Sequence, residues 1–325
     1  MLGMKELKGQ IETNSTTVKC PVKNCSIVVE RQRQHFKREN GFKCPTHNIY
    51  ISPSTFEYEH YTDNLLWKDP EEIQLLESIF KEKRESRMAR DNSEDAVTWN
   101  VFRFLEKNNL TERFLTSITG TPQEKAEIIY WSYSHRERKS WPLLNKARKE
   151  FGEAIRRGSE PDIIIDTDKA IFFIEAKLTA GNNTPSDEKQ IGEKIRNPKK
   201  YKTGGNDWFG NVFGTSYEEI VRKQKYELLR FWLLGTWMAA QTLKTFCLIN
   251  LVREEAEEDI EPVFRKHIKE NPERKFGRLT WEEICKFASD QDNIKDKGAI
   301  TAFFNNKSIG YNKDGQLQKA FSNLE

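Results

Sequence analysis

The sequence predicts an α/β protein in which helices cover both faces of a central sheet, with a small separate module at the N-terminus. Two observations support this fold class. Residues 163–165 and 170–174 are short runs of β-branched and aromatic residues around a polar turn, which indicates two strands of a buried sheet. Helix-period patterns precede and follow them, and 325 residues with 36% hydrophobic content suffice for one substantial core.

The N-terminal module, residues 1–60, is predicted from cysteine spacing. Cys20 and Cys25 form one close pair, and Cys44 and His47 form a second pair after an 18-residue spacer. Two such pairs suit a tetrahedral structural Zn²⁺. So small a segment buries little core, and a metal would supply much of its folding free energy. The alternative is three unrelated cysteines and a solvent-exposed histidine.

The same module is locally basic. Its Lys and Arg side chains between residues 19 and 43 are Lys19, Lys23, Arg31, Arg33, Lys37, Arg38 and Lys43, with His35, Phe36 and Phe42 interleaved. Such a segment can neutralise phosphates and stack bases, which predicts contact with nucleic acid. Charge runs are more often solvated faces, and that alternative stays open.

A helical linker is predicted over residues 61–90, where apolar residues recur at helical spacing before a charged run. The main domain would then occupy residues 91–325. Its first helix begins at a capping sequence around Ser93, and residues 143–158 form a second helical pattern. Farther along the chain, a long helical pattern covers residues 217–243, a buried-strand pattern covers residues 246–252, and the remainder is expected to complete the outer layer.

The predicted hairpin sets two acidic side chains opposite each other. If Asp168 and Lys169 form a two-residue loop, counting outward pairs Asp162 with Glu175. Directly opposed residues of antiparallel strands have Cβ atoms roughly 4.5–5.5 Å apart, close enough for both carboxylates to hold one cation. Lys177 shares their face because side chains alternate with period two.

This arrangement predicts a metal site. Two carboxylates forced together repel, and one would protonate unless a cation compensates. A hard divalent ion, Mg²⁺ or Mn²⁺, is the expected occupant, and it could polarise a phosphoryl oxygen or activate water. Lys177 could orient or help deprotonate that water. An ordinary hairpin with a surface ion pair between Glu175 and Lys177 is the alternative, which the apolar flanks disfavour.

These residues carry a family resemblance. Pro161-Asp162 followed by Glu175-Ala176-Lys177 resembles the signature of the PD-(D/E)XK nuclease superfamily, which has the restriction-endonuclease-like fold. The resemblance covers roughly residues 90–255, including the flanking helices and the following strand. It implies a mixed central sheet flanked by helices. The N-terminal cysteine pairs resemble zinc-ribbon or treble-clef fingers in their knuckles only.

The resemblance implies roles for these side chains. Asp162 and Glu175 would be metal ligands, the Ala176 carbonyl would add a ligand, and Lys177 would be the water-positioning base or electrophile. The helix before the hairpin often lends a third acid to the site. Glu94 is the first choice, although an acid at a helix N-terminus also complements the helix dipole.

Other residues compete for places around this site. Glu150 and Glu153 are rivals for the third acid, because their helical pattern lies nearer the hairpin in sequence. Gln224 or Lys225 on the later helix would also face the site if related nucleases are a guide.

A polar insertion follows the hairpin at residues 181–216. Its basic residues are Lys189, Lys194, Arg196, Lys199, Lys200 and Lys202. Glycine, proline and charge predict a surface loop, which we interpret as a basic clamp beside the scissile phosphate. Trp208, Phe209 and Phe213 would stack on substrate or anchor the loop. A plain disordered loop is the alternative.

Composition fits a cytoplasmic protein. The chain is 32% charged with a mean hydropathy of −0.79, and it has no apolar run of about 18 residues, so no membrane span is expected. No signal-peptide core is visible, and cysteines at zinc-like spacing fit a reducing compartment. Cys247 and Cys285 lie in apolar patterns and are expected in the core. A net charge of +3 leaves nucleic-acid affinity to local patches.

The function predicted from these features is Mg²⁺-dependent hydrolysis of DNA phosphodiester bonds, by an endonuclease of restriction or phage defence. One alternative is a non-catalytic, zinc-containing nucleic-acid-binding protein on a nuclease-like fold. Another is a nuclease acting on RNA or branched DNA. Homodimerisation is left open, since many nucleases of this fold dimerise to cut both strands.

Overall fold

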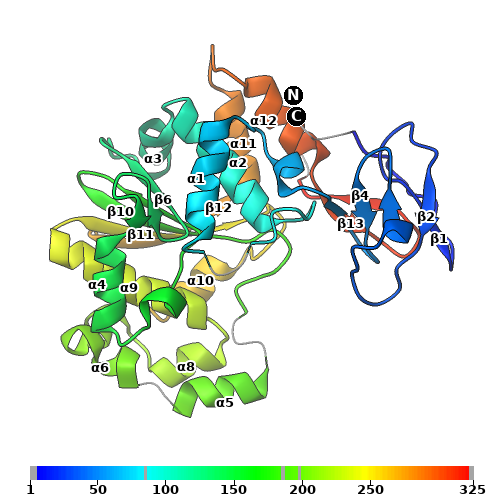
Figure 1. Ribbon diagram of the computed structural model, residues 1–325. Helices are drawn as coiled ribbons and strands as arrows, with labels where there is room; N and C mark the ends of the chain where they lie inside the picture. Colours follow the sequence, from blue (N-terminus) through cyan, green and yellow to red (C-terminus); the bar gives the residue numbers. More distant parts are fainter. Residues whose placement is uncertain (1–5, 84–85, 184–186, 197–198, 322–325) are drawn as a thin grey trace. The chain divides into compact units, whose positions relative to one another are not determined.

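The computed structural model describes residues 6–83, 86–183, 187–196 and 199–321. The chain divides into two compact units (Figure 1). Unit 1 comprises Met1–Gln74, Ser86–Asn108 and Trp281–Glu325, and unit 2 comprises Leu75–Glu85 and Asn109–Thr280. The helix α1 (Pro70–Phe80) runs from the sequence of unit 1 into that of unit 2. Each unit is therefore described by itself.

Unit 2 contains a seven-stranded sheet in the order β12-β11-β10-β9-β6-β7-β8. The strands are β6 (Glu127–Tyr130), β7 (Tyr133–Ser134), β8 (Lys139–Ser140), β9 (Ile163–Asp166), β10 (Ala170–Ala176), β11 (Thr245–Val252) and β12 (Arg274–Thr280). β10, β11 and β12 pair in parallel, and the other neighbours pair antiparallel. The prediction of a mixed sheet in an α/β fold is therefore confirmed.

Helices lie on both sides of this sheet (Figure 1). The helices of unit 2 are α3 (Thr111–Thr119), α4 (Pro142–Glu150), α5 (Glu188–Arg196), α6 (Lys199–Asp207), α7 (Phe209–Val212), α8 (Tyr217–Arg222), α9 (Tyr226–Thr242), α10 (Ile260–Arg265) and the short 3-10 helix η3 (Ile155–Arg157). α9 packs on β10 and β11, where Phe246 contacts Phe173 and Trp232 edge to face. Gly235 makes this approach feasible, because a Cβ there would lie 2.1 Å from the Phe246 ring.

The β9–β10 hairpin has the predicted register. Ile163 pairs with Ile174 and Ile165 with Phe172, while Thr167 donates its N–H to the Ala170 carbonyl at 2.9 Å. This closes the two-residue loop that the sequence predicts. The hairpin is central in the sheet and its apolar side chains are buried on both faces, so it forms a rigid platform.

Two predicted helices are shorter than their sequence patterns. The pattern at 217–243 is interrupted between α8 and α9, where Gln224 has a φ of +58°. The pattern at 143–158 ends with α4, because Gly152 has a φ of +63° and turns the chain. Local left-handed backbone thus overrides helical periodicity at both places.

The prediction of a surface loop over residues 181–216 is wrong where the chain forms α5, α6 and α7. Residues 204–206 within α6 depart from helical dihedral angles. Phe209 and Phe213 are buried in the core of unit 2, and Trp208 donates its indole N–H to Thr236 Oγ1 at 3.0 Å. These aromatic side chains anchor the segment to α9. Residues 184–186 and 197–198 of the predicted loop lie outside the described residues.

Unit 1 combines an N-terminal and a C-terminal part of the described chain, which are bridged between Gln10 and Gln316. Its strands are β1 (Thr17–Lys19), β2 (Val28–Glu30), β3 (Lys43–Cys44), β4 (Ile49–Ile51), β5 (Phe56–Tyr58), β13 (Ser308–Tyr311) and β14 (Leu317–Lys319). Its helices are α2 (Glu94–Lys107), α11 (Trp281–Ser289) and α12 (Lys297–Asn306), with short 3-10 helices η1 (Asn40–Phe42) and η2 (Tyr61–Asn64). β13 lies beside β4 (Figure 1), and Tyr311 donates its N–H to the Ser54 carbonyl at 2.8 Å. β13 and β14 pair as an antiparallel hairpin, which therefore packs against the N-terminal module.

A buried polar network reinforces unit 1. Lys307 is fully buried and donates to Asn64 Oδ1 at 2.7 Å, and its Nζ lies 3.9 Å from Asp91. Tyr58 and Ser308 also donate to the Asp91 carboxyl. Burial lowers the pKa of Lys307 to about 8 even though Asp91 opposes the shift, and burial raises the pKa of Asp91.

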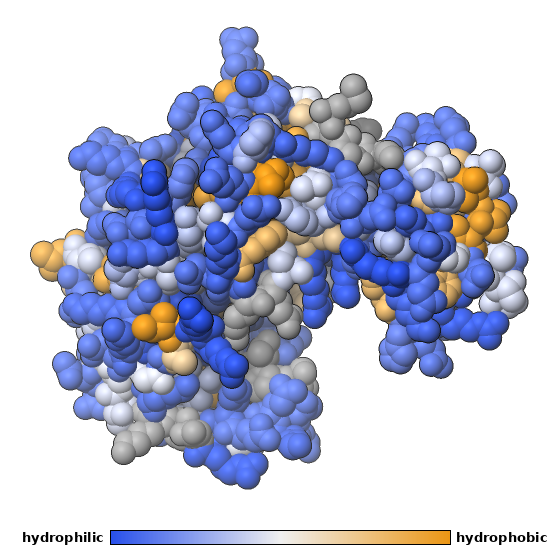
Figure 2. All heavy atoms as spheres, in the orientation of Figure 1, coloured by the Kyte–Doolittle hydropathy of each residue, from blue (hydrophilic) through white to orange (hydrophobic). Residues whose placement is uncertain are grey.

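The face of the molecule in Figure 2 is mostly hydrophilic, with separate small hydrophobic patches. Exposed large hydrophobic side chains among the described residues include Val28, Ile155 and Leu243. Within the described part of the chain, none of the helices is both long and apolar enough to cross a membrane.

Candidate active site and metal centre

Asp162 is held in a fixed orientation at the start of the hairpin. Its Oδ1 accepts a hydrogen bond from the Trp131 indole N–H at 3.1 Å, and its Oδ2 accepts from the Ala176 backbone N–H at 2.9 Å. Trp131 is fully buried and has a φ of +43°, at the turn between β6 and β7. These two hydrogen bonds therefore fix the orientation of the Asp162 carboxylate before any ligand binds.

Glu175 is the next side chain of this group. The hairpin register, extended one pair beyond Ile163 and Ile174, sets it directly opposite Asp162. Only 3% of Glu175 is exposed. Burial raises the pKa of its carboxyl well above the ordinary value; Lys177 lowers the pKa, whereas Asp162 and Glu227 raise it further.

Lys177 completes a compact cluster with a third acid. Its ammonium group pairs with Glu175, and it lies 3.4 Å from Oε2 of Glu227. Glu227 is in the first turn of α9, which brings it over the end of β10. Asp162, Glu175 and Glu227 thus share a partly buried site with Lys177, so carboxylates outnumber ammonium groups among these four residues.

Sequence reasoning missed Glu227. The unbroken helix predicted over 217–243 hides the fact that Glu227 belongs to the first turn of a new helix. A signal exists two residues earlier, because Lys225 is predicted to face the site. It is buried and donates to Asn183 Oδ1 at 3.0 Å. Gln224 occupies the left-handed position between the two helices.

The alternative third acids lie in different settings. Glu94 is the first residue of α2 in unit 1, where Ser93 caps the helix by accepting from the Ala96 N–H. Its participation in a site of unit 2 stays a prediction. Glu150 is exposed at the end of α4.

Glu153 is buried and already engaged by its neighbours. It accepts hydrogen bonds from Ser159 Oγ at 2.7 Å and from the Tyr201 hydroxyl at 2.6 Å, and it lies 3.1 Å from Arg230 Nε. Burial alone would raise the pKa of Glu153, but the Arg230 charge and these hydrogen bonds outweigh it and hold the pKa below its ordinary value. This carboxylate therefore braces α9 against the segment after α4.

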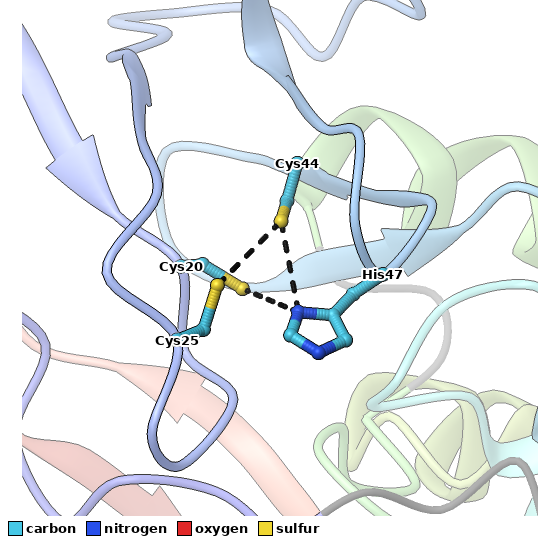
Figure 3. Close-up of side chains that lie close together, drawn as sticks. All are labelled: Cys20, Cys25, Cys44 and His47. Atoms are coloured by element: carbon cyan, nitrogen blue, oxygen red, sulfur yellow. Dashed lines mark hydrogen bonds between the residues drawn. The ribbon is translucent and has the colours of Figure 1, made fainter.

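The predicted cysteine and histidine ligands converge in unit 1 (Figure 3). Cys20 follows β1, Cys25 precedes β2, Cys44 ends β3, and His47 lies in the turn before β4. All four ligand atoms lie within 4.8 Å of one another. Cys25 Sγ is 3.9 Å from Cys44 Sγ, and His47 Nδ1 is 3.4 Å from Cys20 Sγ and 3.6 Å from Cys44 Sγ.

These distances fit the chemistry of zinc. Zn–S bonds of about 2.3 Å and Zn–N bonds of about 2.0 Å in a tetrahedron separate two sulfurs by about 3.8 Å and a sulfur from a nitrogen by about 3.6 Å. The three separations given above agree with these values to within about 0.2 Å. Lys8 further fixes the first knuckle by donating to the carbonyls of Cys20 at 2.8 Å and Cys25 at 2.6 Å.

The basic side chains of this module are largely paired. The pairs are Lys19 with Glu12, Lys23 with Glu6, Lys37 with Glu39, Arg38 with Glu57, and Lys43 with Glu59. Arg31 and Arg33 donate to backbone carbonyls of Asn14 and Ser15. Internal pairing reduces the phosphate attraction expected from the basic run alone, and nucleic-acid contact by the module stays a prediction.

Comparison with known proteins identifies a family. A family model described as Restriction Endonuclease associating with ARP matches residues 30–307, which is most of the chain and includes the β9–β10 hairpin. No curated protein and no solved structure matches the chain. The chain therefore belongs to the family described as Restriction Endonuclease associating with ARP.

Proposed function

We propose that this protein is a metal-dependent endonuclease of the PD-(D/E)XK type that hydrolyses phosphodiester bonds of DNA in restriction or phage defence. The observation that carries the proposal is the buried Glu175 opposite Asp162 on the hairpin, with Lys177 paired to Glu175. Family membership supports nuclease chemistry and a DNA substrate. The restriction-endonuclease-like fold and a cytoplasmic location belong to the same proposal.

Asp162 and Glu175, with the Ala176 carbonyl, would hold Mg²⁺ or Mn²⁺ in this site. When bound, such an ion polarises a phosphoryl oxygen and increases the acidity of water. Asp162 needs no rearrangement for this role, since Trp131 and Ala176 already orient its two oxygens. The Lys177 ammonium favours the ionised form of Glu175, while the Asp162 and Glu227 carboxylates oppose it.

Lys177 would orient the attacking water and offset charge on the phosphate. Its ammonium is held between Glu175 and Glu227, so its position depends on α9 as well as on β10. We assign Glu227 as the acid that positions Lys177. Glu94 stays an alternative source of a third metal ligand.

The Cys20, Cys25, Cys44 and His47 cluster would hold a structural Zn²⁺ that stabilises the module. The hydrophobic core around it is small, which makes a metal contribution important. The module would help grip DNA. The family description names ARP, and we propose that this chain also associates with it.

The proposal is tested by cleavage of linear, circular and single-stranded DNA and of RNA, each with Mg²⁺, Mn²⁺ or EDTA. Asp162→Asn removes one ligand charge, and Asp168→Asn makes the same change at the exposed turn of the same hairpin. We expect metal-dependent DNA cleavage by wild type and Asp168→Asn but not by Asp162→Asn. Equal cleavage by all three proteins would overturn the site; binding without cleavage would favour the non-catalytic alternative, and cleavage of RNA alone would reassign the substrate.

A further inference from the structure

The segment that follows Lys177 has no regular secondary structure, yet part of it is buried. Leu178 and Asn182 are 2% and 1% exposed, and the chain between them has neither helix nor strand. Arg253 Nε donates to the Leu178 carbonyl at 2.8 Å. Side-chain hydrogen bonds, rather than a backbone ladder, therefore fix the path of this segment.

Glu257 is the centre of those hydrogen bonds. Its Oε1 accepts from the Asn182 backbone N–H at 2.7 Å, while its Oε2 accepts from Asn182 Nδ2 at 2.7 Å and from Asn250 Nδ2 at 2.9 Å. Glu257 has a φ of +48°, an unfavourable left-handed conformation for a non-glycine residue. A Cβ at Gly181 would lie only 3.1 Å from Glu257 Oε1, so glycine keeps this approach open.

Asn250 connects this network to the candidate active site. It is fully buried on β11 and pairs in register with Glu175 on β10, so the two side chains are neighbours on one face of the sheet. Asn182 Nδ2 donates to Asn250 Oδ1 at 2.5 Å as well as to Glu257. Both N–H groups of the Asn182 side-chain amide are thus engaged in hydrogen bonds. Its buried Oδ1 accepts no hydrogen bond from the described residues.

A second connection runs through the start of α9. Lys225 Nζ donates to Asn183 Oδ1 at 3.0 Å and to the Asn182 carbonyl at 3.4 Å. Two residues later, Glu227 lies 3.4 Å from Lys177. The network therefore borders the site twice, beside Glu175 through Asn250 and beside Glu227 through Lys225.

We infer that Glu257 is a positioning residue, whose carboxylate holds the segment after Lys177 on β11, while Lys225 holds the same segment at the start of α9. This holds Lys177 and Glu175 in register with Glu227. The catalytic part of the inference rests on the proposed nuclease function. The structural part, in which Glu257 holds residues 178–183 in place, does not rest on that function and can be measured separately.

Glu257→Gln in the full chain is the informative change. It keeps the size of the side chain but replaces one acceptor oxygen with a donor, which must then face another N–H group. Glu258→Gln is the matched control, because Glu258 is the exposed neighbour. Asn182→Ala is a second variant, should Glu257→Gln fail to fold, and it removes the side-chain hydrogen bonds from Asn182 to Glu257 and Asn250.

Hydrogen–deuterium exchange in EDTA tests the structural part. We expect Glu257→Gln to accelerate exchange of amides in residues 178–183 by about 10-fold or more, with exchange of β6 and β9 unchanged. Glu258→Gln should match wild type. Unchanged exchange of this segment in both Glu257→Gln and Asn182→Ala would overturn the inference.

Kinetics test the catalytic part. We expect Glu257→Gln to lower kcat by about 10-fold or more while KM and DNA affinity in EDTA stay within about twofold of wild type, since only the geometry of reacting groups changes. Faster exchange with an unchanged kcat would make the role purely structural and overturn positioning. If wild type cuts no substrate, the proposed function and the catalytic part fail together, while exchange still decides the structural part.

Discussion

Replacing Glu153 by glutamine should strongly destabilise unit 2 without weakening metal binding. Glu153 is a rival metal ligand by sequence, but in the structure its side chain is 1% exposed, and its carboxylate binds Arg230, Tyr201 and Ser159. Glutamine retains the volume but loses the charge. The Arg230 guanidinium, whose side chain is only 18% exposed, would then lack its partner.

The expected loss follows from this burial. Removing one partner of a buried ion pair costs about 3–5 kcal/mol, mostly because the other charge stays desolvated. For a unit of this size, each kcal/mol lowers Tm by about 2–4 °C, which gives a fall of about 6–20 °C. The pKa of Glu153 is held below its ordinary value, so its stabilisation is present above the unfolded carboxyl pKa of 4.5 and is lost as pH falls through the folded pKa.

Urea unfolding at pH 7 and at pH values below 4.5 measures this effect, and Mg²⁺ titration by calorimetry measures metal affinity. Glu150→Gln is the control, because Glu150 is exposed three residues earlier. We expect the free energy of unfolding of Glu153→Gln to be much lower than that of wild type at pH 7 and to differ less in acid. We expect the two proteins to bind Mg²⁺ with equal affinity. A loss below about 1 kcal/mol together with weakened Mg²⁺ binding would refute the bracing role and restore Glu153 as a ligand.

Three further predictions concern the metals and the buried lysine. Cys44→Ser should abolish zinc content by mass spectrometry and unfold the N-terminal module, whereas Cys247→Ser should leave zinc content intact; unchanged zinc in Cys44→Ser would exclude the site. Mg²⁺ at 100 times its Kd should raise the free energy of unfolding of wild type by about 2.7 kcal/mol but leave Glu175→Gln unaffected, and equal stabilisation would place the ion elsewhere. The pKa of Lys307 is lowered to about 8 from 10.5, so between these pH values the unfolded chain binds more protons than the folded one. The free energy of unfolding of wild type should therefore rise by about 1.4 kcal/mol per pH unit relative to that of Lys307→Met. The same pH dependence in both proteins would contradict this.

The parts of the site that the sequence predicts are those set by local rules. A two-residue loop and period-two alternation suffice to place Asp162 opposite Glu175, and the register agrees. The spacing of the cysteine pairs likewise predicts a cluster that forms in unit 1, with Cys20 and His47 only 3.4 Å apart. Both predictions concern neighbours within short stretches of chain.

The parts that escaped prediction depend on tertiary structure. Glu227 reaches Lys177 only because the chain breaks at Gln224 and restarts as α9, which periodicity cannot reveal. The C-terminal hairpin pairs β13 with β14, and its attachment to distant residues, as in the bridge between Gln10 and Gln316, is a tertiary contact. In the segment predicted as a loop, burial of aromatic side chains in the core outweighs its glycine and charge content.

The most direct test of the proposed nuclease site is to compare Lys177→Ala with Lys149→Ala, an exposed lysine on α4, in both DNA binding and cleavage. DNA affinity would be measured in EDTA and cleavage in Mg²⁺. The account predicts equal affinity for both variants, wild-type cleavage by Lys149→Ala, and cleavage by Lys177→Ala reduced by about 100-fold or more. Cleavage by Lys177→Ala at the rate of Lys149→Ala would contradict it.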